Sequence, residues 1–200
     1  MHIDKSIEYS CNGYIYKNFV NLTSAEIKQV FEWRNHSAIR KYMYNPHIIS
    51  YQSHINFIQS LERRNDVSYW LVYKNMKPMG VVNLTSIDFN EKSAELGFYM
   101  VPDVLNSGLG LDFAYANFCF AFNIVGCDLI VGGIHPENKN AILLDRYLGA
   151  VFGKTITRDI DGEIVDFISW TLYRDDFIRD FSNKNDIRVF VKYLRDNQEC

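Results

Sequence analysis

The hydrophobic pattern of the chain is strongest between residues 94 and 122. Residues 94–101 are mostly apolar or aromatic, which predicts a strand, and Pro102 ends it because proline cannot donate to a sheet ladder. Apolar residues then recur at helical spacing over 111–122 and also occupy most of the opposite side, which predicts a buried helix. A short loop with two glycines, 106–110, joins the strand to the helix. The other predicted elements are arranged around this strand, loop and helix.

Shorter elements flank this stretch. Asn12-Gly13 and Asp161-Gly162 each separate two apolar runs, and such pairs favour the two-residue turn of a hairpin. Thr23 and Glu26 form a capping-box pattern that begins a helix near residue 24, and Ser50 is the N-cap of the next helix. Strands are predicted over 7–11, 14–19, 69–73, 79–87, 153–158 and 164–173.

Alternating short helices and strands predict a single mixed α/β sheet with helices around it. No linker or repeat interrupts residues 1–174, so these form one domain. Residues 175–200 carry apolar side chains that include Phe177, Phe181 and Phe190, which predicts a helical extension packed on the sheet or on a partner such as a second copy.

Composition narrows the functional class. The net charge of −3 argues against a general nucleic-acid binder, and the 15% aromatic content suits a large core and a groove with flat walls. The four cysteines and five histidines show no metal-ligand spacing, so no metal is expected. No signal peptide or membrane-spanning run is recognised, which predicts a cytoplasmic protein that does not bind a membrane.

The two-glycine loop is the candidate ligand site. Glycines at a helix start let a backbone approach a ligand closely, and the free N–H groups there attract an anion; the alternative is a loop that needs glycine only for its turn. A dinucleotide fingerprint is excluded because position 113 is Phe, and a P-loop at 149–155 is one residue short.

Strand, loop and helix together resemble the acetyl-CoA motif of the GNAT acetyltransferase superfamily, and residues 128–149 resemble its next strand and helix. The resemblance implies a three-layer α+β fold with a mixed, mostly antiparallel sheet flanked by helices. It also implies that loop amides hold the coenzyme pyrophosphate and that Asn138 binds the pantetheine arm. Leu105 replaces the usual Gln or Arg of the family. The implied acetyl-CoA contacts are Tyr99, Met100, Val101, Asn106, Ser107, Gly108, Leu109, Gly110, Leu111, Asn138 and Ala141.

The run Glu32-Trp33-Arg34-Asn35-His36 resembles two branches of this superfamily, the ribosomal-protein N-terminal acetyltransferases and the N-acetyltransferase of pseudaminic-acid biosynthesis. The second resemblance implies a nucleotide-linked amino sugar as substrate, contacted by Arg34, His54, Thr85 and Tyr99. A guanidinium such as that of Arg34 can bind a phosphate through two hydrogen bonds. The alternatives are a surface ion pair of Arg34 with Glu62, Asp66 or another carboxylate, and a partly buried, hydrogen-bonded His54.

Acetyl transfer to an amine needs a base, a donor to the thioester oxygen and a proton for the leaving sulfur. Glu95 is the candidate base, and its alternative is a structural carboxylate bonded to neighbouring backbone N–H groups. A bulge within 98–101 would free a backbone N–H, that of Met100 or a neighbour, for the oxygen. Many family members protonate the sulfur with a Tyr at the position of Asp145; here another tyrosine, with Tyr99 as one candidate, or water is expected to do so.

The sequence thus predicts a cytoplasmic, acetyl-CoA-dependent N-acetyltransferase that modifies a nucleotide-linked amino sugar for surface-glycan biosynthesis. One alternative is an N-terminal acetyltransferase of the ribosomal-protein type, for which a cluster of carboxylates beside the coenzyme would favour a cationic peptide. The other is a non-catalytic module that binds coenzyme A.

Overall fold

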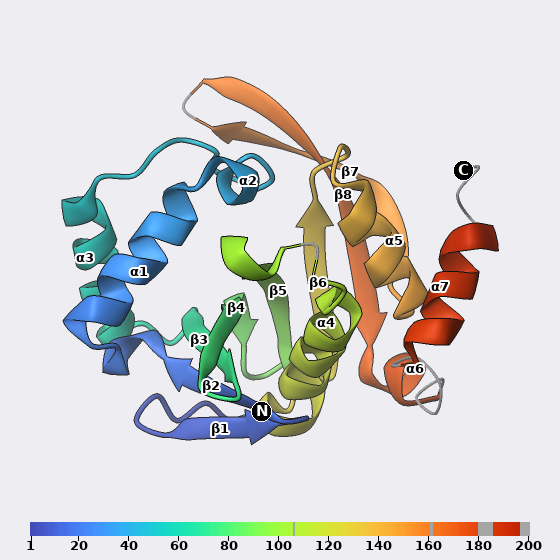
Figure 1. The fold of residues 1–200 in the computed structure, drawn as a ribbon, viewed down its shortest axis with the longest axis horizontal. Helices are drawn as coiled ribbons and strands as arrows, with labels where there is room; N and C mark the ends of the chain where they lie inside the picture. The colour runs from blue at the N-terminus through green and yellow to red at the C-terminus, as the bar shows by residue number, and fades with distance from the viewer. Residues whose placement is uncertain (106, 161, 180–185, 197–200) are drawn as a thin grey trace.

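A computed structural model describes residues 1–105, 107–160, 162–179 and 186–196 (Figure 1). Its centre is an eight-stranded sheet with the order β1-β2-β3-β4-β5-β6-β8-β7. All neighbouring strands are antiparallel except β5 and β6, which are parallel. The strands are β1 Glu8–Cys11, β2 Tyr14–Asn18, β3 Ser68–Lys74, β4 Lys77–Asp88, β5 Ser93–Met100, β6 Leu129–Ile134, β7 Val151–Ile160 and β8 Glu163–Tyr173.

Helices cover both faces of this sheet (Figure 1). They are α1 Ser24–Asn35, α2 Ser37–Arg40, α3 Tyr51–Ser60, α4 Gly110–Cys119, α5 Lys139–Tyr147, α6 Arg174–Arg179 and α7 Ile187–Asp196, and α4 continues as a π-helical stretch, η4 Phe120–Val125. The mixed, mostly antiparallel sheet with flanking helices and a C-terminal helical extension is the fold that the sequence predicted.

The local signals in the sequence correspond to observed element ends. Asn12 and Gly13 both have positive φ, as the predicted β1–β2 turn requires. Thr23 and Glu26 form the complete capping box of α1, and Ser50 accepts the N–H of Ser53 at the start of α3. The β7–β8 hairpin also forms where predicted, although Asp161 of its turn lies outside the described residues.

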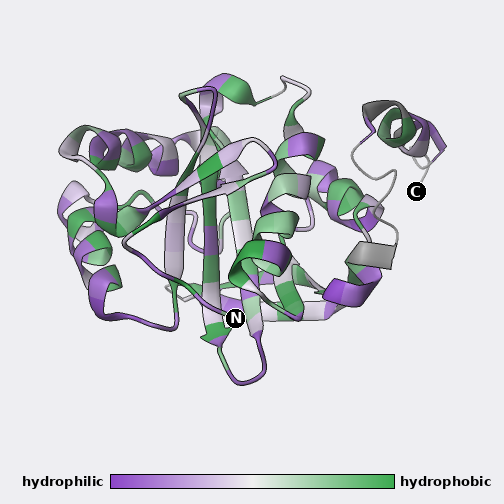
Figure 2. Cartoon of the chain, turned by 90° about the horizontal axis from the view of Figure 1, so that it is seen from below, coloured by the Kyte–Doolittle hydropathy of each residue, from purple (hydrophilic) through white to green (hydrophobic). Residues whose placement is uncertain are grey.

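Two hydrophobic clusters lie on opposite sides of the sheet. Leu71 and Val81 pack with α1 and α3, whereas the alternate residues Trp70, Val72 and Val82 pack with α4. Because successive strand residues point to opposite faces, the sheet separates the two clusters into a three-layer arrangement. Figure 2 shows hydrophobic residues along the central strands and α4, with hydrophilic patches on outer helix surfaces.

The C-terminal extension packs on the main core. The ring of Phe177 on α6 is fully buried, with its centroid 5.9 Å from that of Phe118 and 5.2 Å from that of Phe122. On α7, Phe190 lies 4.9 Å from the ring of Tyr147 on α5. The predicted tail residue Phe181 is outside the described residues.

Strands β5 and β6 separate partway along their length. They pair only from Ser93–Leu129 to Glu95–Val131, and beyond these residues β5 has no described partner on that side. We call this opening, between β5 beyond Glu95 and β6 beyond Val131, the fork. Unpaired strand edges of this kind present free backbone N–H and C=O groups to a ligand.

The sequence prediction of a bulge within 98–101 is wrong. The β4–β5 ladder is regular from Gly80–Met100 to Thr85–Glu95, and its irregularity lies between Thr85 and Asp88. The free backbone edge of β5 therefore arises from the divergence of β6 and not from an extra residue in β5.

Candidate active site

The start of α4 is open and uncapped. Leu109 is the N-cap residue and makes no side-chain capping bond, and Ser107, Gly108 and Leu109 are exposed. Gly108 has a φ of +80°, and a β-carbon built on it would meet no atom within 4 Å. Free N–H groups at a helix start carry partial positive charge, so this loop can accept an anionic group. The predicted contact Asn106 lies outside the described residues.

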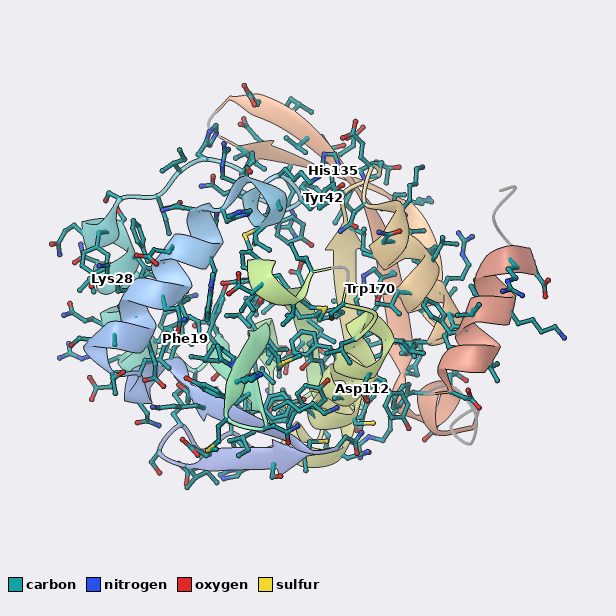
Figure 3. All side chains as sticks on the ribbon, viewed as in Figure 1. Phe19, Lys28, Tyr42, Asp112, His135 and Trp170 are labelled. Carbon is teal, nitrogen blue, oxygen red and sulfur yellow. The ribbon has the colours of Figure 1, made fainter. Side chains whose placement is uncertain are left out.

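The acidic residue in the first turn of α4 does not compete for these amides. The carboxylate of Asp112 accepts the hydroxyl hydrogen of Tyr14 at 2.7 Å and forms an ion pair with Lys74 (Asp112 is labelled in Figure 3). Its charge is therefore neutralised away from the loop. An incoming phosphate meets amide donors and not a free carboxylate.

At the closed end of the fork, Glu95 is the centre of a cluster of side chains. It accepts a hydrogen bond from the hydroxyl of Tyr44, and Nη2 of Arg158 lies 3.3 Å and 3.5 Å from its two carboxylate oxygens. Thr85 stands opposite Glu95 in the ladder, on the same face of the sheet. The partners of Glu95 are these side chains and not the neighbouring backbone N–H groups that the structural alternative required.

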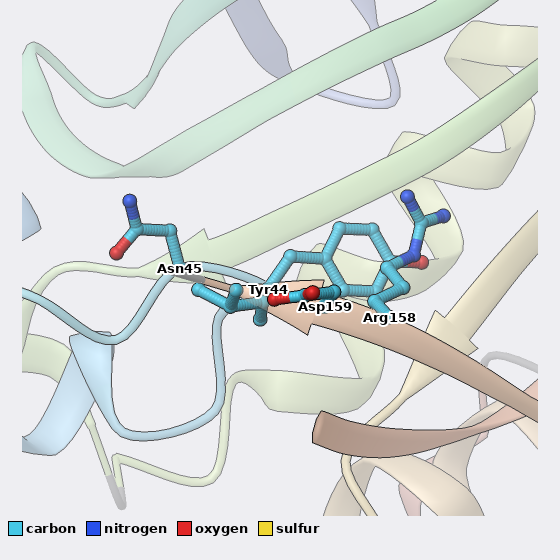
Figure 4. A pocket seen from close by; sticks show the side chains of 5 residues that line it. Tyr44, Asn45, Arg158 and Asp159 are labelled. Carbon is cyan, nitrogen blue, oxygen red and sulfur yellow. The ribbon is translucent and has the colours of Figure 1, made fainter. Parts of the chain in front are cut away.

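Two cavities meet at Arg158. The larger, of about 500 Å³, is lined by Tyr44, Asn45, Arg158, Asp159 and Ile160 (Figure 4). The smaller, of about 220 Å³, is lined by Arg158 together with Glu95, Val131, Gly132, Ile156, Ser169, Trp170 and Thr171. The combined space is of the size that holds a small organic ligand. A carboxylate thus lies beside a ligand-sized cavity at the foot of the fork.

Three cationic side chains, Arg34, Arg40 and Lys41, lie at the end of α1 and in the segment that follows it. Nη2 of Arg34 donates to the backbone carbonyl of Asn45 at 2.6 Å, while its buried Nη1 has no partner among the described residues. Arg40 donates to the carbonyl of Pro46. Burial of the Arg34 guanidinium lowers the pKa of Arg34, and the positive charge of Arg40 lowers it further. Within the described part of the chain, Arg34, Arg40 and Lys41 have no carboxylate at ion-pair distance.

An uncapped helix start, an open strand edge and a nearby carboxylate are features that acetyl transfer from coenzyme A can use. The family model described as an acetyltransferase (GNAT) domain matches residues 18–151. The chain belongs to the GNAT acetyltransferase family. The predicted family, the N-acetyltransferase class and the use of acetyl-CoA are thereby confirmed.

Individual relatives support this assignment. The acetyltransferase PseH of Campylobacter jejuni NCTC 11168 is 34% identical over 128 residues, which cover 64% of this chain and 78% of PseH. The crystal structure of C. jejuni N-acetyltransferase PseH in complex with acetyl coenzyme A superposes with a TM-score of 0.63 and 23% identity over 80% of this chain and 99% of that one. The crystal structure of spermidine N-acetyltransferase from Vibrio cholerae, in complex with CoA and spermine, gives a TM-score of 0.72 at 17% identity. This match covers 83% of the present chain and 98% of the Vibrio chain. The last two similarities show the fold.

The residues of this acetyltransferase fit acetyl-CoA at the loop. The uncapped start of α4 and the empty space over Gly108 would hold the pyrophosphate, and bound there the coenzyme supplies an activated acetyl thioester. Asn138 caps α5 by accepting the Ala141 N–H at 3.3 Å, which leaves its side-chain NH₂ available for a pantetheine carbonyl. Val101 has no free backbone group, because its N–H donates to Met79 and its carbonyl accepts from Val104.

His54 and Tyr99 are two further predicted substrate contacts of the acetyltransferase. His54 is buried between α3 and α1, where its Nε2 lies 3.2 Å from the Ile27 carbonyl, and burial lowers its pKa. This is the structural alternative for His54. Tyr99 interacts electrostatically with Arg34 and lies roughly 13 Å along β5 from Glu95 at the usual rise of a strand. It is therefore well separated from the Glu95 carboxylate.

The alternative of an Arg34–Asp66 ion pair is not observed, because Asp66 pairs with Arg64 at 2.5 Å. Asp145, at the position of the family tyrosine, is buried on α5 with its Oδ1 unpartnered among the described residues. Burial raises the pKa of this carboxyl to about 8. Asp145 is therefore mostly neutral at pH 7.

Sequence reasoning missed Tyr44 and Arg158. Both come from segments remote from Glu95 along the chain, so no local spacing relates them. One signal was readable: two adjacent glycines, Gly132 and Gly133, interrupt β6, and glycine within a strand often marks a close approach. In the structure a β-carbon at Gly133 would lie 2.5 Å from the Tyr44 hydroxyl oxygen.

Within the described residues, no group of three or more His, Cys, Asp or Glu side chains could hold a metal ion, and no helix there is long and apolar enough to cross a membrane.

Proposed function

We propose that this acetyltransferase modifies the amino group of a nucleotide-linked amino sugar, with direct attack of the amine on the acetyl thioester. The observation that carries the proposal is the buried guanidinium nitrogen of Arg34, which has no acceptor among the described residues. Burying a charged donor without a partner is costly. A diphosphate supplies the missing acceptors and a matching charge.

The charges near the cavity favour an anionic substrate over a polyamine or a cationic peptide. Arg34, Arg40 and Lys41 are not neutralised by carboxylates within the described part of the chain, and they lie on α1 and the segment after it. Glu95 and Asp159 are the carboxylates that line the two cavities, and Glu95 is already paired with Arg158. Spermidine would meet net repulsion there. The likeness to the spermidine enzyme therefore supports the fold and is not extended to the substrate.

The resemblance of residues 32–36 to the pseudaminic-acid branch and the 34% identity to PseH support the same substrate class. In this proposal the diphosphate contacts Arg34, the sugar occupies the larger cavity, and the amine points toward Glu95. Thr85, on the same face as Glu95, is placed to contact the sugar. Glu95 removes the proton that the amine loses as it forms the amide.

Thiol release in the presence of acetyl-CoA tests the substrate class directly. We expect release with a UDP-linked 4-amino-4,6-dideoxy sugar, and much slower release with spermidine or with a peptide that has a free N-terminus. Preference for either of the last two would refute the nucleotide-sugar assignment.

Arg34→Ala tests the phosphate contact. We expect the KM for the nucleotide sugar to rise about 10-fold or more, the loss typical of a hydrogen bond to a charged group, with the KM for acetyl-CoA unchanged. Arg64→Ala is the matched control, because Arg64 is an exposed arginine paired with Asp66. For an amino sugar without the nucleotide, Arg34→Ala should have little effect. An equal loss with both sugars would mean that Arg34 does not bind the diphosphate.

A further inference from the structure

The hydroxyl of Tyr44 lies at the foot of the fork, against both strands. It donates to Glu95 on β5, and it approaches β6 so closely at Gly133 that a β-carbon there would be 2.5 Å from its oxygen. Glu95 and Val131 are the last paired residues of β5 and β6. The hydroxyl is therefore located where the opening between the two strands closes.

Tyr44 is held firmly in this place. The guanidinium of Arg158 lies over its ring at 3.9 Å, and the ring of Phe167 packs edge-on at 4.6 Å. Burial, and then the hydrogen bond to Glu95, raise the pKa of Tyr44 above its ordinary value. The phenol is therefore protonated at neutral pH and can act as a hydrogen donor.

The fork also determines where the reacting sulfur would lie. A coenzyme whose pyrophosphate binds at the start of α4 can extend its arm along the free edge of β5, and the arm then ends near Glu95. Tyr44 is bonded to Glu95, whereas Tyr99 is four residues farther along β5 and Asp145 is on α5. Among these three groups, Tyr44 is therefore the best-placed donor for the leaving sulfur.

We propose that Tyr44 is a further catalytic residue, which gives its hydroxyl proton to the departing coenzyme sulfur and regains a proton from Glu95. This inference rests on the acetyl-transfer reaction of the proposed function but not on the identity of the amine. Tyr44 and Glu95 then act as one relay, with Arg158 holding both.

The step balances in atoms and charge. The amine nitrogen forms a bond to the acetyl carbon, and the carbon–sulfur bond breaks with its electron pair on sulfur. Glu95 takes the proton lost by nitrogen, Tyr44 gives its own to sulfur, and protonated Glu95 passes a proton to the Tyr44 oxygen. The products are an amide and a free thiol, and the relay returns to its starting state.

Tyr44→Phe removes the donor and keeps the ring. The decisive measurement is the pKa of the coenzyme A thiol in its complex with the protein, followed by the ultraviolet absorbance of the thiolate. We expect this pKa to lie about one to two pH units higher in Tyr44→Phe than in the unaltered protein, the shift that a lost hydrogen bond to a charged atom produces. An unchanged thiol pKa would overturn the proposal, because a residue that only positions Glu95 would not affect the sulfur.

Kinetics supply a second readout. With whichever amine the unaltered protein acetylates, Tyr44→Phe should lower kcat about 100-fold or more and leave the affinity for acetyl-CoA within about 2-fold. Tyr42→Phe is the matched control, since Tyr42 is on the same segment but its ring packs near His135, 6.0 Å between centroids (Figure 3). If instead Asp145→Asn raised the thiol pKa and Tyr44→Phe did not, the donor would be Asp145. A failed nucleotide-sugar assay would leave both readouts usable with another amine or with coenzyme A alone.

Discussion

The coenzyme loop and the Glu95 cluster are built in different ways. Residues 107–111 are one continuous segment that leads into the start of α4, whose N-cap makes no side-chain bond, so the first backbone N–H groups of the helix face outward. The Glu95 cluster joins side chains from β5, the segment after α2, and β7, which are separated by 51 and 63 residues along the chain. One region depends on local backbone geometry, and the other on how distant elements pack.

The difference teaches which part of the reaction each region can control. Amides of a loop recognise a phosphate whatever side chains surround them, so that region suits a coenzyme shared across a family. The cluster is made of charges and a hydroxyl that depend on side-chain identity. Acceptor choice and proton transfer are therefore expected to depend on the cluster, and coenzyme affinity on the loop.

The largest expected effect is in the cluster. Glu95→Gln keeps the shape of the side chain but removes the base, so kcat should fall about 10²–10⁴-fold. The dissociation constant for acetyl-CoA, measured by calorimetry, should change less than about 2-fold. Glu91→Gln, in the exposed turn before β5, is the control. Equal loss of binding and turnover in Glu95→Gln would erase the distinction between the two regions.

An intermediate effect is expected in the loop. Gly108→Val places a side chain where the pyrophosphate would bind, so the dissociation constant for acetyl-CoA should rise about 10- to 100-fold, or about 1.4–2.7 kcal/mol. Gly13→Val is a close control, because Gly13 has a φ of +77° against +80° for Gly108, and a β-carbon at either meets no atom within 4 Å. Both variants should lose similar stability from backbone strain, and only Gly108→Val should lose affinity. Unchanged affinity in Gly108→Val would contradict the loop assignment.

The smallest expected effect tests a group outside both regions. The carboxyl of Asp145 has a pKa of about 8 when folded, against about 3.9 in an unfolded chain. Between these values the folded state holds a proton that the unfolded state has lost, so this group's contribution to stability falls as pH rises, by at most about 1.4 kcal/mol per pH unit. Asp145→Asn removes that dependence.

Denaturant unfolding of the two proteins at pH 5, 6, 7 and 8 measures this. The unfolding free energy of Asp145→Asn minus that of the unaltered protein should increase steadily with pH. A difference that does not vary with pH would mean that Asp145 is not buried in its neutral form. Its charged carboxylate would then be a candidate active-site group.

Much of the fold was readable from short segments. The Thr23–Glu26 capping box, the Asn12-Gly13 turn and the apolar helix after Gly110 each depend on residues close together in the chain, and each was predicted within a few residues. The candidate coenzyme loop belongs to this group. Glu95 was also named in advance, although its partners were not.

Other features depend on how separate elements meet. The sequence suggested a bulge in β5, whereas the free edge comes from β6 diverging after Val131. It left open whether His54 contacts a ligand or is a buried, hydrogen-bonded histidine, and the packing of α3 on α1 directs this ring to the Ile27 carbonyl. Neither outcome follows from residue spacing.

By itself, the sequence determined the uncapped glycine loop, the buried helix that follows it and the strand that carries Glu95, because propensity, turn geometry and capping act over a few residues. Only the tertiary structure decided that Tyr44 and Arg158 reach Glu95 and that Arg34 keeps a buried, unpaired nitrogen. The physical reason is that these contacts depend on strand register, on the divergence of β5 from β6, and on the missing side chain of Gly133, all of which are set when distant segments pack together.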